Sequence, residues 1–217
     1  MLDLTQLSLY FAAALLLAVT PGPGIFYVAA RSLAGGRGEG VASSFGTGLG
    51  GMLHVLAGSL GVSALVLASA ELFTLLKLAG AAYLVWLGLR TIRAARGLNA
   101  AAPPLGPGAA PPMGARRAFR EGVLVEALNP KTAAFFLAFV PQFVDPAAGH
   151  VALQFVVLGS VSVVLNTLAD VVVAIAASGI RRGAAARPTL IRRLRQGSGG
   201  AMVALGLGLA FARRPAG

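Results

Sequence analysis

The sequence predicts an all-α integral membrane protein with six transmembrane helices, arranged as two inverted three-helix repeats in which the first and fourth helices are broken by proline. Three observations predict this fold. The 217 residues are 57% hydrophobic and only 12% charged, whereas charged residues make up about 25% of an ordinary soluble domain. Apolar runs of roughly the 20 residues needed to cross a bilayer recur along the chain. Two of these runs carry matched breaks at proline.

The apolar runs define six candidate helices. No Lys or Arg precedes Arg31, so the first run lacks the basic region that begins a cleaved signal peptide, and we interpret it as a retained helix. The last run is short and glycine-rich, so of the six it is the weakest candidate for a helix that crosses the whole bilayer. The runs cover residues 6–30, 41–67, 72–92, 119–141, 151–179 and 198–212.

Arginine is concentrated in two of the predicted loops. Because cytoplasmic loops retain Lys and Arg, we expect both loops to face the cytoplasm, together with the first loop at residues 31–40. Six helices would then place both termini outside. Arg213 and Arg214 argue against this unless the last helix fails to span. The third loop carries Arg90, Arg93, Arg96, Arg116, Arg117 and Arg120, the fifth carries Arg181, Arg182, Arg187, Arg192, Arg193 and Arg195, and the second and fourth carry Glu71, Asp145 and His150 but no arginine.

A segment rich in proline and glycine divides the chain. The composition of residues 94–117 is typical of a flexible linker, and we expect it to separate a first repeat (1–93) from a second (118–217). The net charge of +11 would suit nucleic acid, but aromatic side chains are not interleaved with the arginines, which argues against nucleic acid and for a lipid bilayer. The absence of cysteine excludes disulfides and thiol chemistry.

The two halves repeat one pattern. The first apolar run is interrupted by "TPGPG" at residues 20–24, and the fourth by "NPK" at residues 129–131. An aromatic pair follows each break, beginning at Phe26 and at Phe135, five residues after the first proline. Because each half has three helices, the second half must enter the membrane from the opposite side. The result is an inverted repeat, which is common among secondary transporters.

A broken helix leaves backbone groups that hydrocarbon cannot satisfy. A half-helix starting near Gly22 would point free N–H groups at the midplane, a suitable site for the carboxylate of an amino acid. Gly22 and Gly24 would let such a ligand approach the backbone closely. For either break taken alone, the alternative is a plain proline kink without a functional role.

The "TPGPG" at residues 20–24, the "ALNPK" at residues 127–131, the glycine-rich second helix and the basic Pro/Gly linker together resemble the LysE/RhtB family of bacterial amino-acid exporters. The resemblance extends over nearly the whole chain. It implies a multi-pass protein of the bacterial inner membrane that exports amino acids or close derivatives, such as lysine, arginine, threonine, homoserine, homoserine lactone or leucine, driven by the proton gradient. It does not identify the substrate. The motif positions that carry over as substrate-binding candidates are Pro21, Gly22, Pro23, Gly24, Asn129, Pro130 and Lys131.

Polar residues within the apolar runs add further candidates. His54 lies in a four-residue rhythm of small residues on the second helix, which indicates either close helix packing with His54 bonded to a neighbour, or a ligand for substrate or proton. Asn166 and Asp170 share one face of the fifth helix. An intramembrane carboxylate usually faces a cavity or a partner. We expect Asp170 to carry the coupled proton and Asn166 to contact substrate, with a structural salt bridge from Asp170 to Lys131 as the alternative.

Two charged residues flank the second break. Glu126 lies three residues before Asn129, so its carboxylate and the Asn129 amide could coordinate an ammonium group. Lys131 could neutralise a carboxylate. The alternative is an ion pair between Glu126 and Lys131.

Other function classes call for other residues. With no cysteine and no G-x-S-x-G or H-E-x-x-H motif, the chain is not expected to be an enzyme or to need a cofactor. His54 and His150 are too few for a histidine-built metal site. A cation or metal-ion exporter stays open, because Glu126 and Asp170 could surround an ion. The glycine stripe is compatible with a homodimer and equally with tight packing inside one chain.

Overall fold

The computed structural model describes residues 4–68 and 111–180, with isolated helical positions between 75 and 93 and between 196 and 207. Throughout this described part the regular structure is helical, which confirms the all-α prediction. The elements are α1 (Leu4–Val19), α2 (Pro23–Gly35), α3 (Arg37–Ala68), α5 (Ala115–Ala127), α6 (Pro130–Ala134), the π-helical turn η1 (Phe135–Phe139), the 3₁₀ turns η2 (Val140–Phe143) and η3 (Pro146–Ala148), and α7 (Val151–Ile180).

Both predicted breaks are present at the predicted prolines. Pro23 occupies the start of α2, where its missing N–H costs nothing, and Gly22 precedes it in an extended conformation. Pro130 begins α6 in the same way, after Asn129, whose side chain accepts a hydrogen bond from the backbone N–H of Lys131. The chain bends by 46° between α1 and α2, and by 44° between α5 and the segment from Pro130 to Phe143. The two breaks therefore bend the chain by nearly the same angle.

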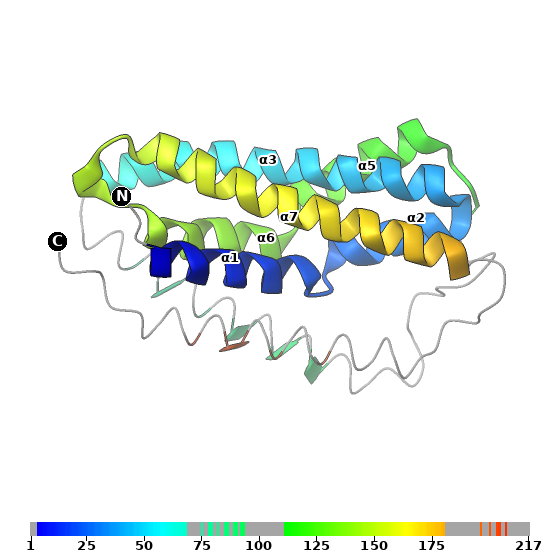
Figure 1. The fold of residues 1–217 in the computed structure, drawn as a ribbon, viewed down its shortest axis with the longest axis horizontal. Helices are drawn as coiled ribbons and strands as arrows, with labels where there is room; N and C mark the ends of the chain where they lie inside the picture. Colours follow the sequence, from blue (N-terminus) through cyan, green and yellow to red (C-terminus); the bar gives the residue numbers. More distant parts are fainter. Residues whose placement is uncertain are drawn as a thin grey trace.

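The two broken segments run in opposite directions. In Figure 1, α1 and α2 follow one another along the bundle, and α5 and α6 follow one another the other way. Helix α3 returns from the end of α2, and α7 returns from η3. As a result, the α2–α3 turn, the start of α5 and the end of α7 share one end of the bundle, which we call the basic end because it carries Arg31, Arg37 and Arg116.

The first predicted loop is much shorter than the interval between the apolar runs. Residues 31–40 are helical apart from Gly36, which has φ 78° and is the single residue between α2 and α3. Arg31 and Glu39, on either side of this turn, are both 4% exposed and lie 3.7 Å apart as an ion pair. The two charges are therefore buried against each other across the turn.

Part of the six-helix prediction falls on described residues. Within them, the Val151–Gly179 helix is long and apolar enough to cross a membrane. Two bent segments, α1 with α2 and α5 with the Pro130–Phe143 segment, are also long and apolar enough if each is counted as one span. The predicted helices at 72–92 and 198–212, and most of the linker at 94–117, lie outside the described residues. Six spans therefore stay a prediction.

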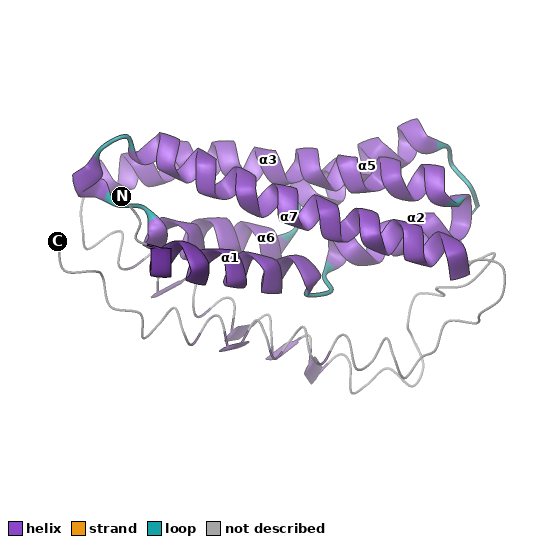
Figure 2. Ribbon diagram, in the orientation of Figure 1, coloured by secondary structure: helices purple, strands orange, loops and turns teal. Residues whose placement is uncertain are grey.

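The described bundle is apolar outside and encloses both an apolar core and a set of polar side chains. Large apolar side chains such as Leu9, Leu53 and Leu168 are exposed, as expected for helices surrounded by lipid. The loops that the structure describes between these helices are short, so few of the described backbone groups need partners outside a helix (Figure 2). The interior contains buried polar side chains, among them Thr20, Thr47, Glu126, Asn129, Lys131, Thr132, Ser162 and Asp170.

Glycines on α3 allow its neighbours to approach closely. A Cβ added at Gly50 would lie 2.6 Å from the carbonyl oxygen of Val123 on α5, and one at Gly58 would lie 2.5 Å from the Phe155 ring on α7. The predicted small-residue stripe is therefore used for packing within one chain. A homodimer stays a prediction that this stripe does not support.

Candidate functional site

The two helix breaks contact each other through Lys131. Its ammonium group donates to the carbonyl oxygen of Thr20 at 2.9 Å and to that of Leu17 at 3.3 Å. Both carbonyls lie at the end of α1; that of Leu17 also accepts the Thr20 N–H at 3.1 Å, and that of Thr20 lies beyond the last helical turn. The Lys131 side chain also passes close to Gly22, because a Cβ there would lie 3.1 Å from Nζ. The cation of the second break thus satisfies the helix end that the first break opens.

Glu126 lies on the other side of the same junction. Its Oε2 accepts a hydrogen bond from Asn129 Nδ2 at 2.9 Å, and its Oε1 accepts one from the Thr132 hydroxyl at 2.6 Å. A Cβ at Gly24, in the first turn of α2, would lie 2.6 Å from Oε2. The carboxylate, 1% exposed, therefore rests against the N-terminus of the second half-helix. The predicted pairing of Glu126 with Asn129 is present.

His54 is bonded to a neighbour, as the packing alternative expected. Its Nε2 lies 2.9 Å from the carbonyl oxygen of Glu126, at the end of α5, and its ring stacks on Phe136 with centroids 6.2 Å apart. It does not line the cavity described next. In this conformation His54 supports the end of α5 beside the second break.

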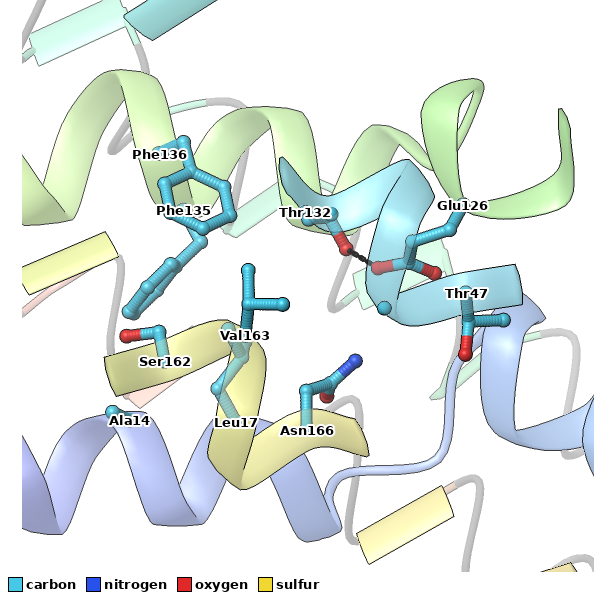
Figure 3. Close-up of a pocket in the computed structure, with 12 residues that line it drawn as sticks. Ala14, Leu17, Thr47, Glu126, Thr132, Phe135, Phe136, Ser162, Val163 and Asn166 are labelled. Carbon is cyan, nitrogen blue, oxygen red and sulfur yellow. Dashed lines mark hydrogen bonds between the residues drawn. The ribbon is translucent and has the colours of Figure 1, made fainter. Parts of the chain in front are cut away.

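A small cavity lies between the halves of the described bundle. Its volume of about 20 Å³ is room for one water molecule, given that a water needs about 10–15 Å³. Figure 3 shows Glu126, Thr132, Thr47 and Asn166 around one part of it, with Phe135 and Ser162 farther along. The lining residues are Ala14, Leu17, Thr47, Gly48, Gly51, Glu126, Thr132, Phe135, Phe136, Ser162, Val163 and Asn166.

Asp170 lies next to this cavity without lining it. Its Oδ2 is 2.7 Å from the Thr47 hydroxyl, which does line the cavity. Its Oδ1 is buried and has no hydrogen-bond partner among the described residues. Asn166, one helical turn before Asp170, is half-buried and lines the cavity.

The alternative ion pairs are not formed in the part of the chain that the structure describes. Lys131 donates to backbone carbonyls and pairs with neither Glu126 nor Asp170. Of the predicted site residues, Glu126 and Asn166 line the cavity. Lys131, Gly22 and Gly24 do not line it and lie where the two breaks meet. Pro21, Pro23 and Pro130 shape the breaks and do not line the cavity.

Sequence reasoning missed two hydroxyl residues of the site. Thr132 directly follows the "NPK" motif, so extending the motif by one residue would have found it. Thr47 lies beside Gly46 in the glycine stripe of α3, and only its contact with Asp170 on α7 distinguishes it from a packing residue. No local pattern could have found that contact, because it joins residues 123 positions apart.

Comparison with known proteins places the chain in a family. The family model of the LysE type translocator matches residues 15–213. An uncharacterised membrane protein of Vibrio cholerae is 33% identical over 159 residues, 73% of this chain and 74% of its own. A second, from Pseudomonas aeruginosa, is 33% identical over 168 residues, 77% of each chain. No solved structure matches the chain.

One of the relatives has a name that describes an activity. The homoserine/homoserine lactone efflux protein of Salmonella typhimurium is 33% identical over 159 residues, 72% of this chain and 73% of its own. The family model covers nearly all of the chain, and both of its motif-bearing breaks fall inside the match. The chain therefore belongs to the LysE type translocator family and is a membrane protein of that family.

Proposed function

We propose that this translocator exports an amino acid or a close derivative, such as homoserine, homoserine lactone, threonine, lysine or leucine, from the cytoplasm across the bacterial inner membrane. The observation that carries the proposal is the junction of the two broken helices. There Lys131 of the second break holds the end of α1, and Glu126 rests against the start of α2. Buried charges of both signs at one junction suit a zwitterion.

The two charges suggest how a substrate is oriented. Glu126 lines the cavity and would receive the ammonium group, together with the half-buried amide of Asn166. The carboxylate would lie toward Lys131 and the N-terminus of α2, whose first turn has no side-chain cap. The ammonium of Lys131 has three hydrogens, and two of them already have acceptors. The third is available to a substrate oxygen.

The size of the cavity means that the described conformation is not the substrate-bound one. A space for one water cannot hold an amino acid, so the junction must widen to load substrate. Each broken segment bends by about the same angle, 46° and 44°, and the two run antiparallel. Movement of one half against the other about this junction would expose the cavity alternately to each side, as in transporters built from inverted repeats.

The six-span topology forms part of this proposal. The end of α3 and the start of α5, which residues 69–110 must join, lie at opposite ends of the described bundle (Figure 1). The two broken segments, α1–α2 and α5–α6, also start at opposite ends of the bundle. Both relations support two halves of opposite orientation, with the basic end facing the cytoplasm.

Asp170 is the proposed proton site. It is 1% exposed, adjacent to the cavity and, among the described residues, not held in an ion pair, which suits a charge that changes in the transport cycle. Replacing Asp170 by Asn should abolish uptake of homoserine into everted vesicles against its gradient when driven by an acidic interior. Exchange of homoserine without a gradient should persist. If the Asp170→Asn protein still concentrates homoserine, Asp170 does not carry the coupled proton.

A transport panel tests the export function itself. Cells with and without the protein are loaded with dipeptides of each amino acid, and intracellular accumulation of the free amino acid is measured. Lower accumulation of one or a few amino acids supports the proposal. The competing function is cation export by Glu126 and Asp170, and loading with divalent cations in a parallel arm decides between them. Equal accumulation of every amino acid with selective loss of a cation would reverse the assignment.

A further inference from the structure

The Thr47 hydroxyl faces two acceptors but has one proton. Its Oγ1 lies 2.7 Å from Asp170 Oδ2 and 2.8 Å from the carbonyl oxygen of Ser44. A hydroxyl donates one hydrogen bond and accepts up to two. If Asp170 is ionised, Thr47 can donate to only one of these oxygens, and the other contact brings two acceptors together without a proton. Both contacts are satisfied at once when Asp170 carries a proton and donates it to Thr47, which then donates to Ser44.

Glu126 has the opposite pattern. Each of its oxygens accepts from a donor that has its own proton, Asn129 Nδ2 and the Thr132 hydroxyl, so the ionised form is fully satisfied. Asp170 has one oxygen without any described donor and the other against a shared hydroxyl. The charged groups that act on Asp170 from the neighbouring helices are Glu126 on α5 and Lys131 on α6. Hydrogen-bond geometry thus assigns the exchangeable proton of the site to Asp170 and the permanent charge to Glu126.

We propose that Thr47 relays the proton between Asp170 and the substrate cavity; the inference rests on the proposed proton-coupled export. Thr47 both lines the cavity and contacts Asp170, whereas Asp170 itself does not line it. When the proton leaves, Asp170 passes it to Thr47 Oγ1, while the original Thr47 proton turns from the Ser44 carbonyl and moves to a water in the cavity. Thr47 ends with one proton, now directed at the Asp170 carboxylate, and the water leaves as hydronium.

This relay makes proton release depend on what the cavity contains. An ammonium group beside Glu126 and Thr47 adds positive charge near Asp170, which favours the ionised carboxylate and expels the proton. A proton arriving from the other side reverses the step and weakens the hold on the ammonium group. Competition of this kind between proton and substrate is what an antiporter requires.

The experiment compares Thr47→Val, which removes the hydroxyl at nearly constant volume, with Thr47→Ser, which keeps it. The probe is homoserine, or the best substrate of the panel, in everted vesicles. We expect Thr47→Val to lower uptake driven by an acidic interior about tenfold or more, as for loss of one hydrogen bond to a charged group. Gradient-free exchange should stay within about threefold, and Thr47→Ser should restore driven uptake. The matched control is Thr167→Val on α7, because within the described part of the chain the Thr167 hydroxyl bonds to the Val163 carbonyl of its own helix and to no ionisable group.

A double-mutant cycle separates coupling from structure. Because Asp170→Asn alone should abolish driven uptake, the cycle is read in gradient-free exchange: Thr47→Val combined with Asp170→Asn should exchange homoserine no worse than Asp170→Asn alone, since the hydroxyl would act only through that carboxylate. Additive losses, or equal loss of exchange and driven uptake in Thr47→Val, would overturn the relay. If the valine variant fails to insert, Thr47→Ala removes the same hydroxyl without adding volume, and the same comparisons apply. Failure of the proton site itself gives a different result: Asp170→Asn then still concentrates substrate, whatever the Thr47 variants do.

Discussion

The ammonium of Lys131 and the carbonyl oxygen of Thr20 are 2.9 Å apart, so a cation of the second broken helix holds the open end of the first. This contact spans 111 residues of sequence and joins the two halves of the chain at the centre of the described bundle. Lys131 is 4% exposed and its charge is balanced at short range by backbone dipoles rather than by a carboxylate. The motif lysine therefore has a structural role that does not depend on substrate.

That role predicts a stability effect. Lys131→Met removes two donors from buried carbonyls, and a hydrogen bond to a charged group contributes about 1.5–3 kcal/mol, so the melting temperature in detergent should fall by about 5 °C or more. The measurement is thermal unfolding of the purified protein without substrate. Arg117→Met is the control, because Arg117 is exposed and its pair with Glu121 should contribute less than about 1 kcal/mol. Equal melting temperatures for both variants would contradict the holding role of Lys131.

The glycines of the first break should tolerate no side chain. Gly24→Ala places a Cβ 2.6 Å from Glu126 Oε2, so the carboxylate must move away from α2. Homoserine exchange should fall about tenfold or more if a charge-assisted bond to Glu126 is lost. Gly22→Ala, whose Cβ meets the flexible end of Lys131 at 3.1 Å, should cost less, and Gly22→Leu should abolish export in a protein that still inserts. Gly38→Ala, with no atom near its Cβ, should transport normally. Normal transport by Gly22→Leu would exclude a ligand at this break.

Glu126→Gln should impair exchange and driven uptake together. A glutamine can keep its carbonyl oxygen toward Asn129 Nδ2 and turn its NH₂ toward the Thr132 hydroxyl, which can accept as well as donate. Both hydrogen-bond contacts can therefore persist, and the expected loss comes from the missing negative charge. Loss of the charge removes the proposed ammonium partner. Both assays on everted vesicles, normalised to inserted protein, measure the effect.

The contrast with Asp170→Asn is the control for this prediction. If Glu126→Gln keeps exchange and loses only driven uptake, the proton site belongs to Glu126 instead. A second check uses 4-hydroxybutanoate, which keeps the carboxylate and hydroxyl of homoserine and lacks its ammonium group. It should not compete with homoserine in the unmodified protein. Effective competition would contradict the proposal that Glu126 binds the ammonium group.

The basic end of the bundle should face the cytoplasm. The chain has no cysteine, so single-cysteine variants report position without background. Arg116→Cys at the start of α5 should resist an impermeant thiol reagent applied to intact cells, and Ala147→Cys in η3, at the opposite end, should react. Both residues are exposed, so burial does not account for a difference. The reverse labelling pattern would invert the orientation.

The breaks were predictable because their cause is local. Pro23 and Pro130 lack the N–H that a continuous helix needs, so each half-helix must begin there whatever packs against it. The pairing of Glu126 with Asn129 was predictable for the same reason, since a three-residue spacing brings the two side chains together. The connection predicted over residues 31–40 narrows to a turn at Gly36, and the burial of Arg31 against Glu39 beside it is recognisable only in the folded chain.

The sequence by itself determined that this chain belongs in a bilayer, that two of its helices break at proline, and that a few ionisable residues stay inside the apolar runs. Composition and backbone chemistry act at each position independently of the rest of the fold. Only the tertiary structure decided which partners those residues meet: Lys131 meets the carbonyls of Thr20 and Leu17 rather than Glu126, and Asp170 meets Thr47 rather than Lys131. Such pairings depend on how helices from the two halves pack, and hydrogen bonds of about 3 Å do not follow from spacing along one chain.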